Sequence, residues 1–300
     1  MKKDFISISD MDPKEIQAIF ELTGKLKKNK SKFAKALSGK TIALIFQKPS
    51  NRTRVSFEVG MYQLGGNSIY LGPDEINLGV RESIHDVAKT LSRYCDGIVL
   101  RTYEHKNVLE MAKFASIPVI NGLSDFSHPC QALADIFTVK EKLKSLKGKT
   151  LVYTGDGNNV CNSLIYACFK TGMKINVATP AGFEPESSVV RAAGGSVRLF
   201  NDPIEAAKGA DVVYTDVWAS MGQEDEAEKR KEIFKPFQVN QKLLSFANKG
   251  ALVMHCLPAH RGQEITDGAI DSPQSVVFDE AENRMHVQKA ILIKLLGAKK

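Results

Sequence analysis

The sequence predicts an α/β protein with two doubly wound domains, each a parallel sheet with helices on both faces. Short apolar runs alternate with longer helical patterns along most of the chain, and this rhythm restarts after Lys147-Gly148-Lys149. The 300 residues also exceed what one hydrophobic core usually serves. We therefore expect domains at 1–146 and 147–280, followed by a closing helix within 281–300.

Strands are predicted where β-branched and large apolar residues run together, and helices where the pattern is longer. The first helix begins with a capping signature, Asp12 followed by Pro13 and by Glu15 at the third helical position. The strands expected in the first half are 41–46, 67–71, 97–101 and 117–120. The further helices expected there are 53–64, 82–94, 106–115 and 130–145. The strands expected in the second half are 150–154, 174–178, 196–200, 211–214 and 251–255. Its expected helices are 158–171, 185–193, 203–208 and the apolar pattern 290–296.

Composition excludes several classes of protein. Hydrophobic residues make up 43% and charged residues 25%, as in soluble globular proteins. No stretch approaches the roughly 20 apolar residues of a membrane span, and the N-terminus lacks the apolar core of a signal peptide. We expect a cytoplasmic protein without a membrane partner. The five cysteines form an odd set without a Cys-x-x-Cys pair, which argues against a disulfide framework and a thiolate zinc site.

The chain is basic, with 41 Lys and Arg against 34 Asp and Glu. Most of the lysine excess is scattered through predicted solvated helices, and no basic stretch is interleaved with aromatic residues. This distribution argues against a nucleic-acid partner. A small anionic substrate explains a positive field equally well, because a cleft can focus it.

The segment 49–54 lies where the first apolar strand gives way to a helix. It contains Ser50, Thr53 and the two arginines Arg52 and Arg54. Backbone N–H groups at a helix start, the helix dipole and guanidinium forks together favour bound phosphate. The alternative is an ordinary serine cap followed by exposed arginines that pair locally, such as Arg54 with Glu58. Taken alone, this turn leaves both interpretations open.

A glycine turn, Gly155-Asp156-Gly157, follows the first strand of the second half and resembles part of a dinucleotide-binding motif. Val160 replaces the third glycine, and Thr179-Pro180 stands where a ribose-binding carboxylate is expected. A dehydrogenase is therefore the weaker hypothesis, which NADH fluorescence would test.

Other polar residues lie at predicted strand ends, where open α/β sheets bind ligands. Each has a structural alternative: His128 as a cap, Cys256 as a buried apolar side chain, and Arg284 as a surface partner of Glu280. The segments concerned are Arg101, 128–131, Asn158-Asn159, 216–222, 255–258 and 282–284, the last of which we expect to open the final helix.

These motifs, in this order, resemble those of the ornithine carbamoyltransferases, part of the aspartate/ornithine carbamoyltransferase superfamily. The resemblance covers nearly the whole chain. It implies a carbamoyl-phosphate domain, an ornithine domain, an active site in the cleft between them, and a last helix that packs back on the first domain. It also implies a homotrimer with sites near subunit boundaries. The motifs are Ser50-Asn51-Arg52-Thr53-Arg54, Asn121-Gly122-Leu123-Ser124-Asp125, His128-Pro129-Cys130-Gln131, Ser220-Met221-Gly222, His255-Cys256-Leu257-Pro258 and Glu280-Ala281-Glu282-Asn283-Arg284.

Carried over residue by residue, the resemblance implies the following sites. The phosphate of carbamoyl phosphate is assigned to Ser50, Asn51, Arg52 and Thr53. The carbamoyl group is assigned to Arg101, His128 and Gln131 with help from Arg284, and the same site includes Asn77, Pro129, Cys130, Cys256 and Leu257. Ornithine is assigned to Asn159, Asp216, Ser220 and Met221, with its reactive amine near Asp216, Cys256 and Leu257. The catalytic residues implied are Arg101, His128, Asp216 and Cys256.

Two residues depart from the family pattern. Asn51 stands where the family usually has Thr, but its backbone N–H and side-chain amide can still bind phosphate. Asn77 stands where the family has a Gln or His contributed across a subunit boundary, and it is shorter.

The implied reaction is attack of ornithine Nδ on the carbamoyl carbon, followed by loss of phosphate to give citrulline. Arg101, His128 and Thr53 can donate hydrogen bonds to the developing oxyanion, each worth about 3 kcal/mol. The amine, with a pKa near ~10.4 in water, must lose its proton first. Asp216 or Cys256 could orient it or accept that proton, or the leaving phosphate could. No metal or organic cofactor is needed.

Other acceptors give the alternative function, and their charges differ. Aspartate brings a second carboxylate and calls for extra cations, whereas Asp216 and Cys256 suit a cationic amine. Putrescine lacks the α-carboxylate that the Ser220-Met221-Gly222 loop would bind. N-acetylornithine needs an apolar space that the sequence does not define. A catalytically dead paralogue conflicts with the intact Arg52, Arg101, His128 and Cys256. The sequence leaves open whether citrulline serves arginine synthesis or arises in arginine breakdown.

Overall fold

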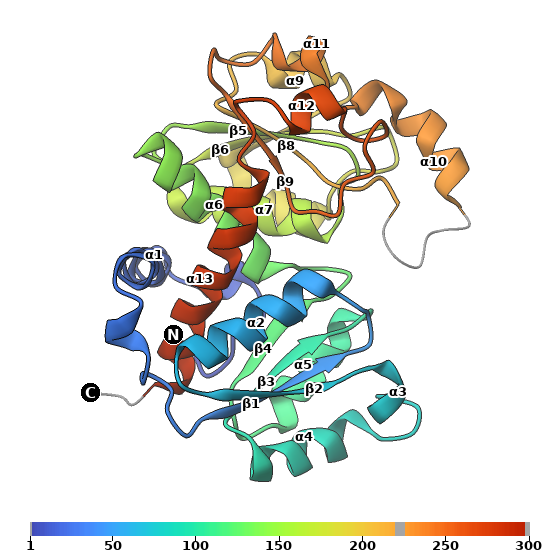
Figure 1. Ribbon diagram of the computed structural model, residues 1–300. Helices are drawn as coiled ribbons and strands as arrows, with labels where there is room; N and C mark the ends of the chain where they lie inside the picture. The colour runs from blue at the N-terminus through green and yellow to red at the C-terminus, as the bar shows by residue number, and fades with distance from the viewer. Residues whose placement is uncertain (1, 220–225, 298–300) are drawn as a thin grey trace. The chain divides into compact units, whose positions relative to one another are not determined.

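The computed structural model describes residues 2–219 and 226–297, and the chain divides into two compact units (Figure 1). The first unit comprises Met1–Leu133 and Glu282–Lys300, and the second comprises Ala134–Ala281. The division falls within helix α6 (Pro129–Leu143) and again within helix α13 (Val277–Leu296), whereas the joint expected from the sequence is 147–149. Among the described residues, no helix combines the length and apolar character that crossing a bilayer requires.

The first unit contains a parallel sheet with the strand order β2-β1-β3-β4. Its strands are β1 (Thr41–Phe46), β2 (Asn67–Leu71), β3 (Gly97–Arg101) and β4 (Val119–Leu123). Its helices are α1 (Pro13–Lys28), α2 (Asn51–Gln63), α3 (Pro73–Ile76), α4 (Ile84–Tyr94) and α5 (His105–Phe114), with 3₁₀ turns at Ile8–Asp10 and Ser31–Phe33. Helix α2 lies over one face of the sheet and α4 over the other (Figure 1).

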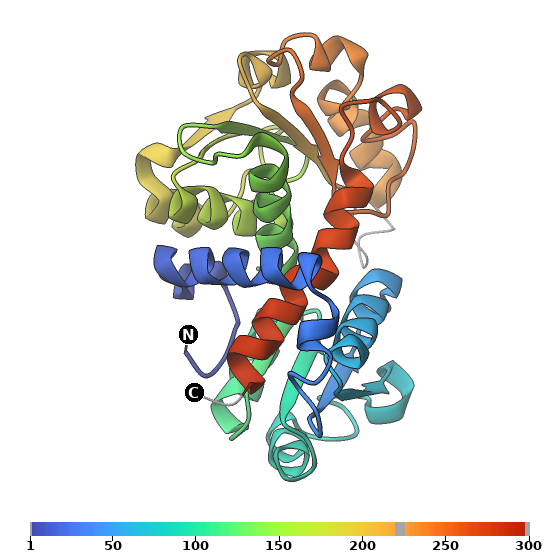
Figure 2. The same ribbon diagram turned by 60° about the vertical axis from the view of Figure 1, so that its left-hand side comes forward.

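Burial explains why the strands of the first unit read as continuous apolar runs. Ala43, Ile45 and Ile98 pack against Val87 of α4 and Met111 of α5, and all five are buried. Helices α1 and α13 lie side by side in this unit, where Lys27 Nζ donates to Asn283 Oδ1 at 2.7 Å (Figure 2). A parallel sheet covered on both faces buries alternate side chains in both directions, so its strands show little polar alternation.

The second unit contains a parallel sheet with the strand order β7-β6-β5-β8-β9. Its strands are β5 (Thr150–Thr154), β6 (Lys174–Ala178), β7 (Val197–Phe200), β8 (Val212–Thr215) and β9 (Leu252–His255). Its further helices are α7 (Asn159–Thr171), α8 (Ser187–Ala193), α9 (Pro203–Ala207), α10 (Ala227–Phe234), α11 (Gln241–Leu244) and α12 (Asp267–Ile270), with 3₁₀ turns at Gly194–Ser196 and Lys235–Phe237.

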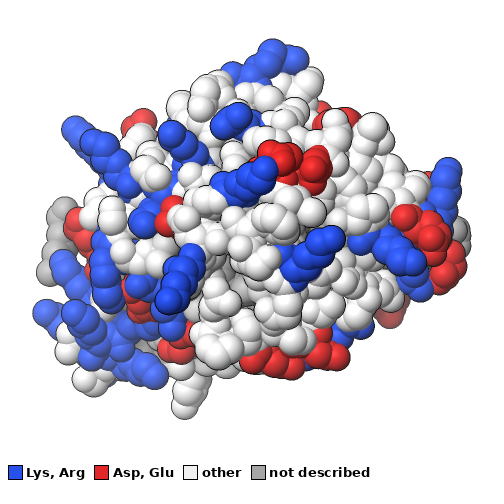
Figure 3. Space-filling view, turned by 90° about the horizontal axis from the view of Figure 1, so that it is seen from above, with Lys and Arg blue, Asp and Glu red and all other residues white. Residues whose placement is uncertain are grey.

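Helices cover both faces of the second sheet. Helices α9, α11 and α12 lie on one face, and α6 and α7 lie on the other (Figure 1). The side chains of Val152, Val213 and Val253 point into the core beneath the first group and are buried. On the face seen from above in Figure 3, basic and acidic side chains are interspersed with broad uncharged areas.

The predicted fold class is confirmed: both units are parallel α/β sheets with helices on both faces. Three details differ from the sequence-based expectation. The strand expected at 117–120 lies at Val119–Leu123, because Pro118 precedes the ladder and its carbonyl accepts from the Ile98 N–H. The last helix begins at Val277, well before the expected opening at 282–284. Helices α3, α10, α11 and α12 lie in stretches where no helix was expected.

Candidate active site in two halves

The first half-site is built on the turn that joins β1 to α2. Ser50 has extended backbone and caps the helix, since its Oγ accepts the Thr53 N–H at 3.2 Å. The Ser50 hydroxyl also lies 3.0 Å from Thr53 Oγ1, and Thr53 is fully buried. The serine-cap interpretation is therefore correct. The positive end of the α2 dipole lies at the same turn.

Two arginines that are distant in sequence converge on Thr53. Arg284 of α13 places Nη2 at 2.6 Å from Thr53 Oγ1, and Arg101 at the end of β3 places Nη1 at 3.4 Å from the same oxygen. The β3–β4 register shifts between Leu100 and Arg101, an irregularity that re-aims the side chain at the strand end. Arg284 Nη1 also donates to Gln131 Oε1 at 3.0 Å. Arg284 is 4% exposed, so the alternative of a surface pair with Glu280 is wrong.

His128 is buried beside these arginines, directly before α6. Desolvation, followed by the charges of Arg284, Arg101 and Arg52, holds the pKa of the His128 imidazole well below its ordinary value. The ring is therefore neutral at physiological pH and offers one N–H donor. We call Arg52, Arg101, Arg284 and this imidazole the arginine cluster. Three guanidinium groups around a neutral donor form an electrostatic site for an anion.

The two arginines of the β1–α2 turn differ in environment. Arg52 contributes to the field at His128, whereas Arg54 Nε pairs with Glu58 Oε1 at 3.0 Å and its guanidinium stacks 3.8 Å above the Tyr70 ring. The Arg54 side chain is about half exposed, at 46%. The local-pair alternative thus holds for Arg54 alone.

The remaining predicted residues of this half differ in their surroundings. Asn51 opens α2 and is exposed, and Pro129 opens α6. Cys130 is buried with its thiol 3.6 Å from the Asn121 carbonyl, and burial raises the pKa of that thiol to about 12, so it is an unreactive packing residue. Asn77 ends α3 in a left-handed conformation with a φ of 49° and is exposed.

The second half-site centres on Asp216, directly after β8. Its Oδ1 accepts from the Cys256 thiol at 3.0 Å and from the Val217 N–H at 2.8 Å, and its Oδ2 accepts from Asn158 Nδ2 at 2.8 Å. We call Asp216, Cys256 and Asn158 the Asp216 cluster. Desolvation and then the Asp216 carboxylate raise the pKa of Cys256 well above its ordinary value. The thiol therefore stays protonated and acts as a donor, not as a base.

Cys256 is placed by an unusual backbone after β9. Leu257 has a φ of 56°, and its N–H donates to His255 Nδ1 at 2.8 Å. Because Nδ1 accepts, the network assigns the ring proton to Nε2, which lies 3.0 Å from Glu264 Oε1. His255 and Glu264 are both fully buried. One ligand atom each of Asp216, His255 and Cys256 lie within 4.8 Å of one another, but both His255 nitrogens are engaged, and we assign no metal here.

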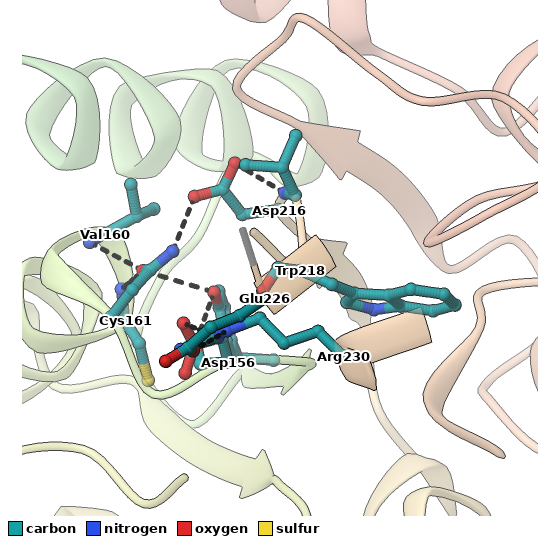
Figure 4. A network of polar contacts seen from close by, with 10 residues as sticks. Asp156, Val160, Cys161, Asp216, Trp218, Glu226 and Arg230 are labelled. Atoms are coloured by element: carbon teal, nitrogen blue, oxygen red, sulfur yellow. Dashed lines mark hydrogen bonds and ion pairs between the residues drawn. The ribbon is translucent and has the colours of Figure 1, made fainter. Parts of the chain in front are cut away.

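A charged network joins the neighbouring turns. Arg230 of α10 donates through Nη1 to Asp156 Oδ2 at 3.0 Å and to the Trp218 carbonyl at 2.9 Å, and through Nε to Glu226 Oε2 at 3.2 Å (Figure 4). Desolvation raises the pKa of Asp156 to about 6 against the lowering effect of Arg230. This network fixes the chain on the N-terminal side of the segment 220–225. Ser220 and Met221 themselves lie outside the described residues.

Comparison with known proteins identifies the family. Residues 3–141 match "Aspartate/ornithine carbamoyltransferase, carbamoyl-P binding domain", and residues 147–295 match "Aspartate/ornithine carbamoyltransferase, Asp/Orn binding domain". The chain belongs to the aspartate/ornithine carbamoyltransferase family.

Several members of this family are similar over their whole length. The ornithine carbamoyltransferase of Pyrococcus horikoshii is 56% identical over 99% of this chain and 97% of its own. The relative from Pyrococcus furiosus named "Ornithine carbamoyltransferase, anabolic" is 54% identical over 98% of this chain and 96% of its own. The solved ornithine carbamoyltransferase structure from Pyrococcus furiosus superposes with a TM-score of 0.95 at 53% identity, covering 99% and 98% of the two chains. The Thermus thermophilus structure gives 0.91 at 44% identity, covering 99% of each.

The structure adds polar residues that sequence reasoning did not assign to the site of this carbamoyltransferase. Asn158, whose amide holds Asp216, lies in the predicted segment Asn158-Asn159, but the site assignment named only Asn159, which begins α7. The Asn158 side chain also caps α7 by accepting from the Val160 N–H at 2.9 Å, so an asparagine before an apolar helix was the available signal. Arg230 gave no signal, because the sequence did not predict α10.

Proposed function

We propose that this protein transfers the carbamoyl group of carbamoyl phosphate to the side-chain amine of L-ornithine, which releases L-citrulline and phosphate. The arginine cluster is the observation that carries the proposal. Three guanidinium groups from the β1–α2 turn, β3 and α13 act on one buried imidazole, which suits a small dianion with a carbonyl group. The full-length similarity to proteins named ornithine carbamoyltransferase supports it.

The proposed carbamoyl-phosphate site uses the start of α2 and the arginine cluster. Ser50, Asn51, Arg52 and Thr53 hold the phosphate, since hydroxyl, backbone and guanidinium donors meet at a helix N-terminus. Arg101, His128 and Gln131 bind the carbamoyl group, with Arg284 linking Gln131 to Thr53. Pro129 and Cys130 place His128 and Gln131 at the start of α6.

The proposed ornithine site uses the Asp216 cluster. Asp216 orients the substrate ammonium, and Cys256 and Asn158 hold the carboxylate from two sides. Asn159, Ser220 and Met221 bind the α-amino and α-carboxylate groups, and the segment at Leu257 lies beside the reactive amine. The same segment, Cys256 and Leu257, contacts the carbamoyl group in this proposal.

The chemistry follows from these charges. The neutral amine forms a bond to the carbamoyl carbon, and the C–O bond to phosphate breaks from the tetrahedral adduct. Arg101, neutral His128 and the Thr53 hydroxyl stabilise the oxyanion, each by about 3 kcal/mol. Because the Cys256 thiol stays protonated, Asp216 or the leaving phosphate takes the amine proton. No step calls for a metal or an organic cofactor.

We also propose a cytoplasmic homotrimer in which Asn77 completes a neighbouring site. The support lies on the first unit, where several large apolar side chains are exposed around the edge strand β2. They are Val55, Tyr62, Ile69 and Val80, at 47%, 81%, 50% and 81% exposure. Asn77 lies in the same loop as Val80, and its carbonyl accepts the Val80 N–H. We place the reaction in arginine biosynthesis, which the anabolic Pyrococcus furiosus relative supports.

The direct test is formation of citrulline and phosphate from carbamoyl phosphate and ornithine by the purified protein. Equal amounts of the two products are expected. Release of phosphate without citrulline would contradict the proposal, as would citrulline formation that survives loss of Arg101.

A further inference from the structure

Three buried polar side chains meet behind the Asp216 cluster, in the second unit. They are Asp135 of α6, Tyr214 of β8 and Glu280 of α13, at 0%, 0% and 1% exposure. The Tyr214 hydroxyl lies 3.1 Å from Asp135 Oδ2 and 3.3 Å from Glu280 Oε1. The other Glu280 oxygen, Oε2, accepts the backbone N–H of His255 at 3.1 Å.

This arrangement needs one proton more than the Tyr214 hydroxyl supplies. The Tyr214 hydroxyl has a single proton and can donate to only one of the two carboxyl groups at a time. If Tyr214 donates to one carboxyl group, its contact with the other is a hydrogen bond only when that second group carries a proton and donates to the Tyr214 oxygen. Burial, followed by the Asp135 charge, raises the pKa of Glu280 well above its ordinary value. The geometry thus places one proton on this pair of carboxyl groups, and burial favours Glu280 as its carrier.

We propose that Asp135 and Glu280 share one proton and together act as a positioning pair for the two strand ends that carry Asp216 and Cys256. This inference rests on the proposed function for its role in catalysis. Tyr214 lies two residues before Asp216 on β8, and His255 lies directly before Cys256 on β9. One acid pair therefore holds both strand ends by hydrogen bonds, and it sets where the thiol and carboxylate of the Asp216 cluster meet.

The surrounding groups make loss of the shared proton unfavourable. The ionisable neighbours are Tyr214 on β8, Cys168 on α7, and Cys256 and His255 at the end of β9, with Asp216 just beyond β8. Burial, followed by nearby carboxylates, raises the pKa values of Tyr214, Cys168 and Cys256, and the His255 ring is engaged with Glu264. A second charge on the pair would repel Asp216 and leave the Tyr214 hydroxyl facing two carboxylates with one proton to donate. Strand-end geometry is therefore expected to degrade at alkaline pH.

Infrared spectroscopy tests the shared proton without reference to activity. The difference spectrum between wild-type protein and Glu280→Gln at neutral pH should contain the carbonyl band of a protonated carboxylic acid. Asp135→Asn, which leaves Glu280 without its charged partner, should shift or remove the same band. Asp279→Asn is the matched control, because Asp279 precedes Glu280 on α13 but pairs with Lys142 at the surface. The proposal is contradicted if Glu280→Gln loses no protonated-acid band relative to the wild-type protein.

Kinetics test the positioning role. In the wild type, ornithine KM should rise at alkaline pH as the shared proton is lost. Glu280→Gln mimics the protonated acid, so its ornithine KM should stay within about threefold of wild type at neutral pH and should not rise at alkaline pH. Glu280→Ala leaves the His255 N–H without its buried acceptor and should raise ornithine KM about tenfold with unchanged carbamoyl-phosphate affinity. Tyr214→Phe should act in the same direction if the alanine variant does not fold. A rise in ornithine KM at alkaline pH that persists in Glu280→Gln overturns the inference. A wild-type protein that makes no citrulline overturns the proposed function, and the infrared result then decides whether the proton is shared.

Discussion

Single residues in both half-sites are kept uncharged by their surroundings. His128 is surrounded by guanidinium groups and stays a neutral imidazole, and Cys256 lies beside a carboxylate and stays a thiol. Both are therefore hydrogen-bond donors with fixed roles over the physiological pH range. The charges that remain are the arginines in one half and Asp216 in the other, which match an anionic donor and a cationic acceptor.

The two arginines of the β1–α2 turn provide a matched pair of variants. Arg52→Ala removes one charge-assisted donor from the arginine cluster and should weaken carbamoyl-phosphate binding by about 2 kcal/mol. Arg54→Ala removes only the exposed pair with Glu58 and should leave the affinity unchanged within about 0.5 kcal/mol. Calorimetric titration of both folded variants measures the difference. Equal affinities would remove Arg52 from the phosphate site.

The pH dependence of the rate follows from the same ionisation states. Turnover with saturating ornithine should rise from about pH 6 toward about pH 8–9, because only the neutral amine attacks. The lowered pKa of His128 means that the imidazole is already neutral throughout this range, and the raised pKa of Cys256 removes the thiol as a base. A rate–pH profile should therefore keep its rising limb in Cys256→Ser. A limb that disappears in this variant would make the thiol the titrating group.

Elements that contribute to the half-sites come from distant parts of the sequence. The regular strands and the first helices are predictable, because strands that are buried on both faces of a sheet have continuous apolar sequences. Helices α10, α11 and α12 are short and lie on the surface of their unit, and two of them have only four residues, so no periodicity marks them. Helix α13 begins earlier than its apolar pattern suggests because its first turns carry Glu280 and Arg284, which are buried through polar contacts.

Helix α10 is tied to its unit through Arg230 and through Phe234, which is fully buried. The guanidinium and its partner Asp156 are 9% and 13% exposed, so loss of one partner leaves a nearly buried charge. Arg230→Met should lower the free energy of unfolding by about 3 kcal/mol. Lys231→Met, which removes an exposed pair with Glu228, should cost at most about 0.5 kcal/mol. Urea unfolding followed by tryptophan fluorescence compares them, and equal midpoints would contradict the buried role.

At the scale of the whole molecule, the sequence predicted the residue types of the candidate site but not the hydrogen bonds that join them. The β1–α2 turn and Asp216 were predicted as parts of the candidate site because ligands bind at the strand ends of parallel sheets. The link from Arg284 to Thr53 spans most of the chain and leaves no local pattern. The hydrogen bond between Asn158 and Asp216 also leaves no local pattern, since its partners follow different strands, β5 and β8. Ornithine contacts at 220–221 stay a prediction.

Assembly is predicted to depend on the exposed apolar side chains around β2. Ile69→Lys places a charge on this edge strand and should convert the trimer to a monomer, with loss of most activity, because Asn77 then cannot complete a neighbouring site. Leu199→Lys is the control on β7, the edge strand of the other sheet, where Leu199 is similarly exposed at 46%. Light scattering with parallel assays measures both. A fully active Ile69→Lys monomer would contradict shared sites.

The choice of acceptor tests the central claim most directly. The measurement is kcat/KM for ornithine, N-acetylornithine, putrescine and aspartate under one set of conditions, with wild type and Asp216→Asn. Ornithine should exceed each other acceptor by roughly a hundredfold or more, because unpaired or like-charged buried groups cost the others several kcal/mol. Asp216→Asn should reduce that preference. Any acceptor that surpasses ornithine with the wild-type protein would contradict the assignment.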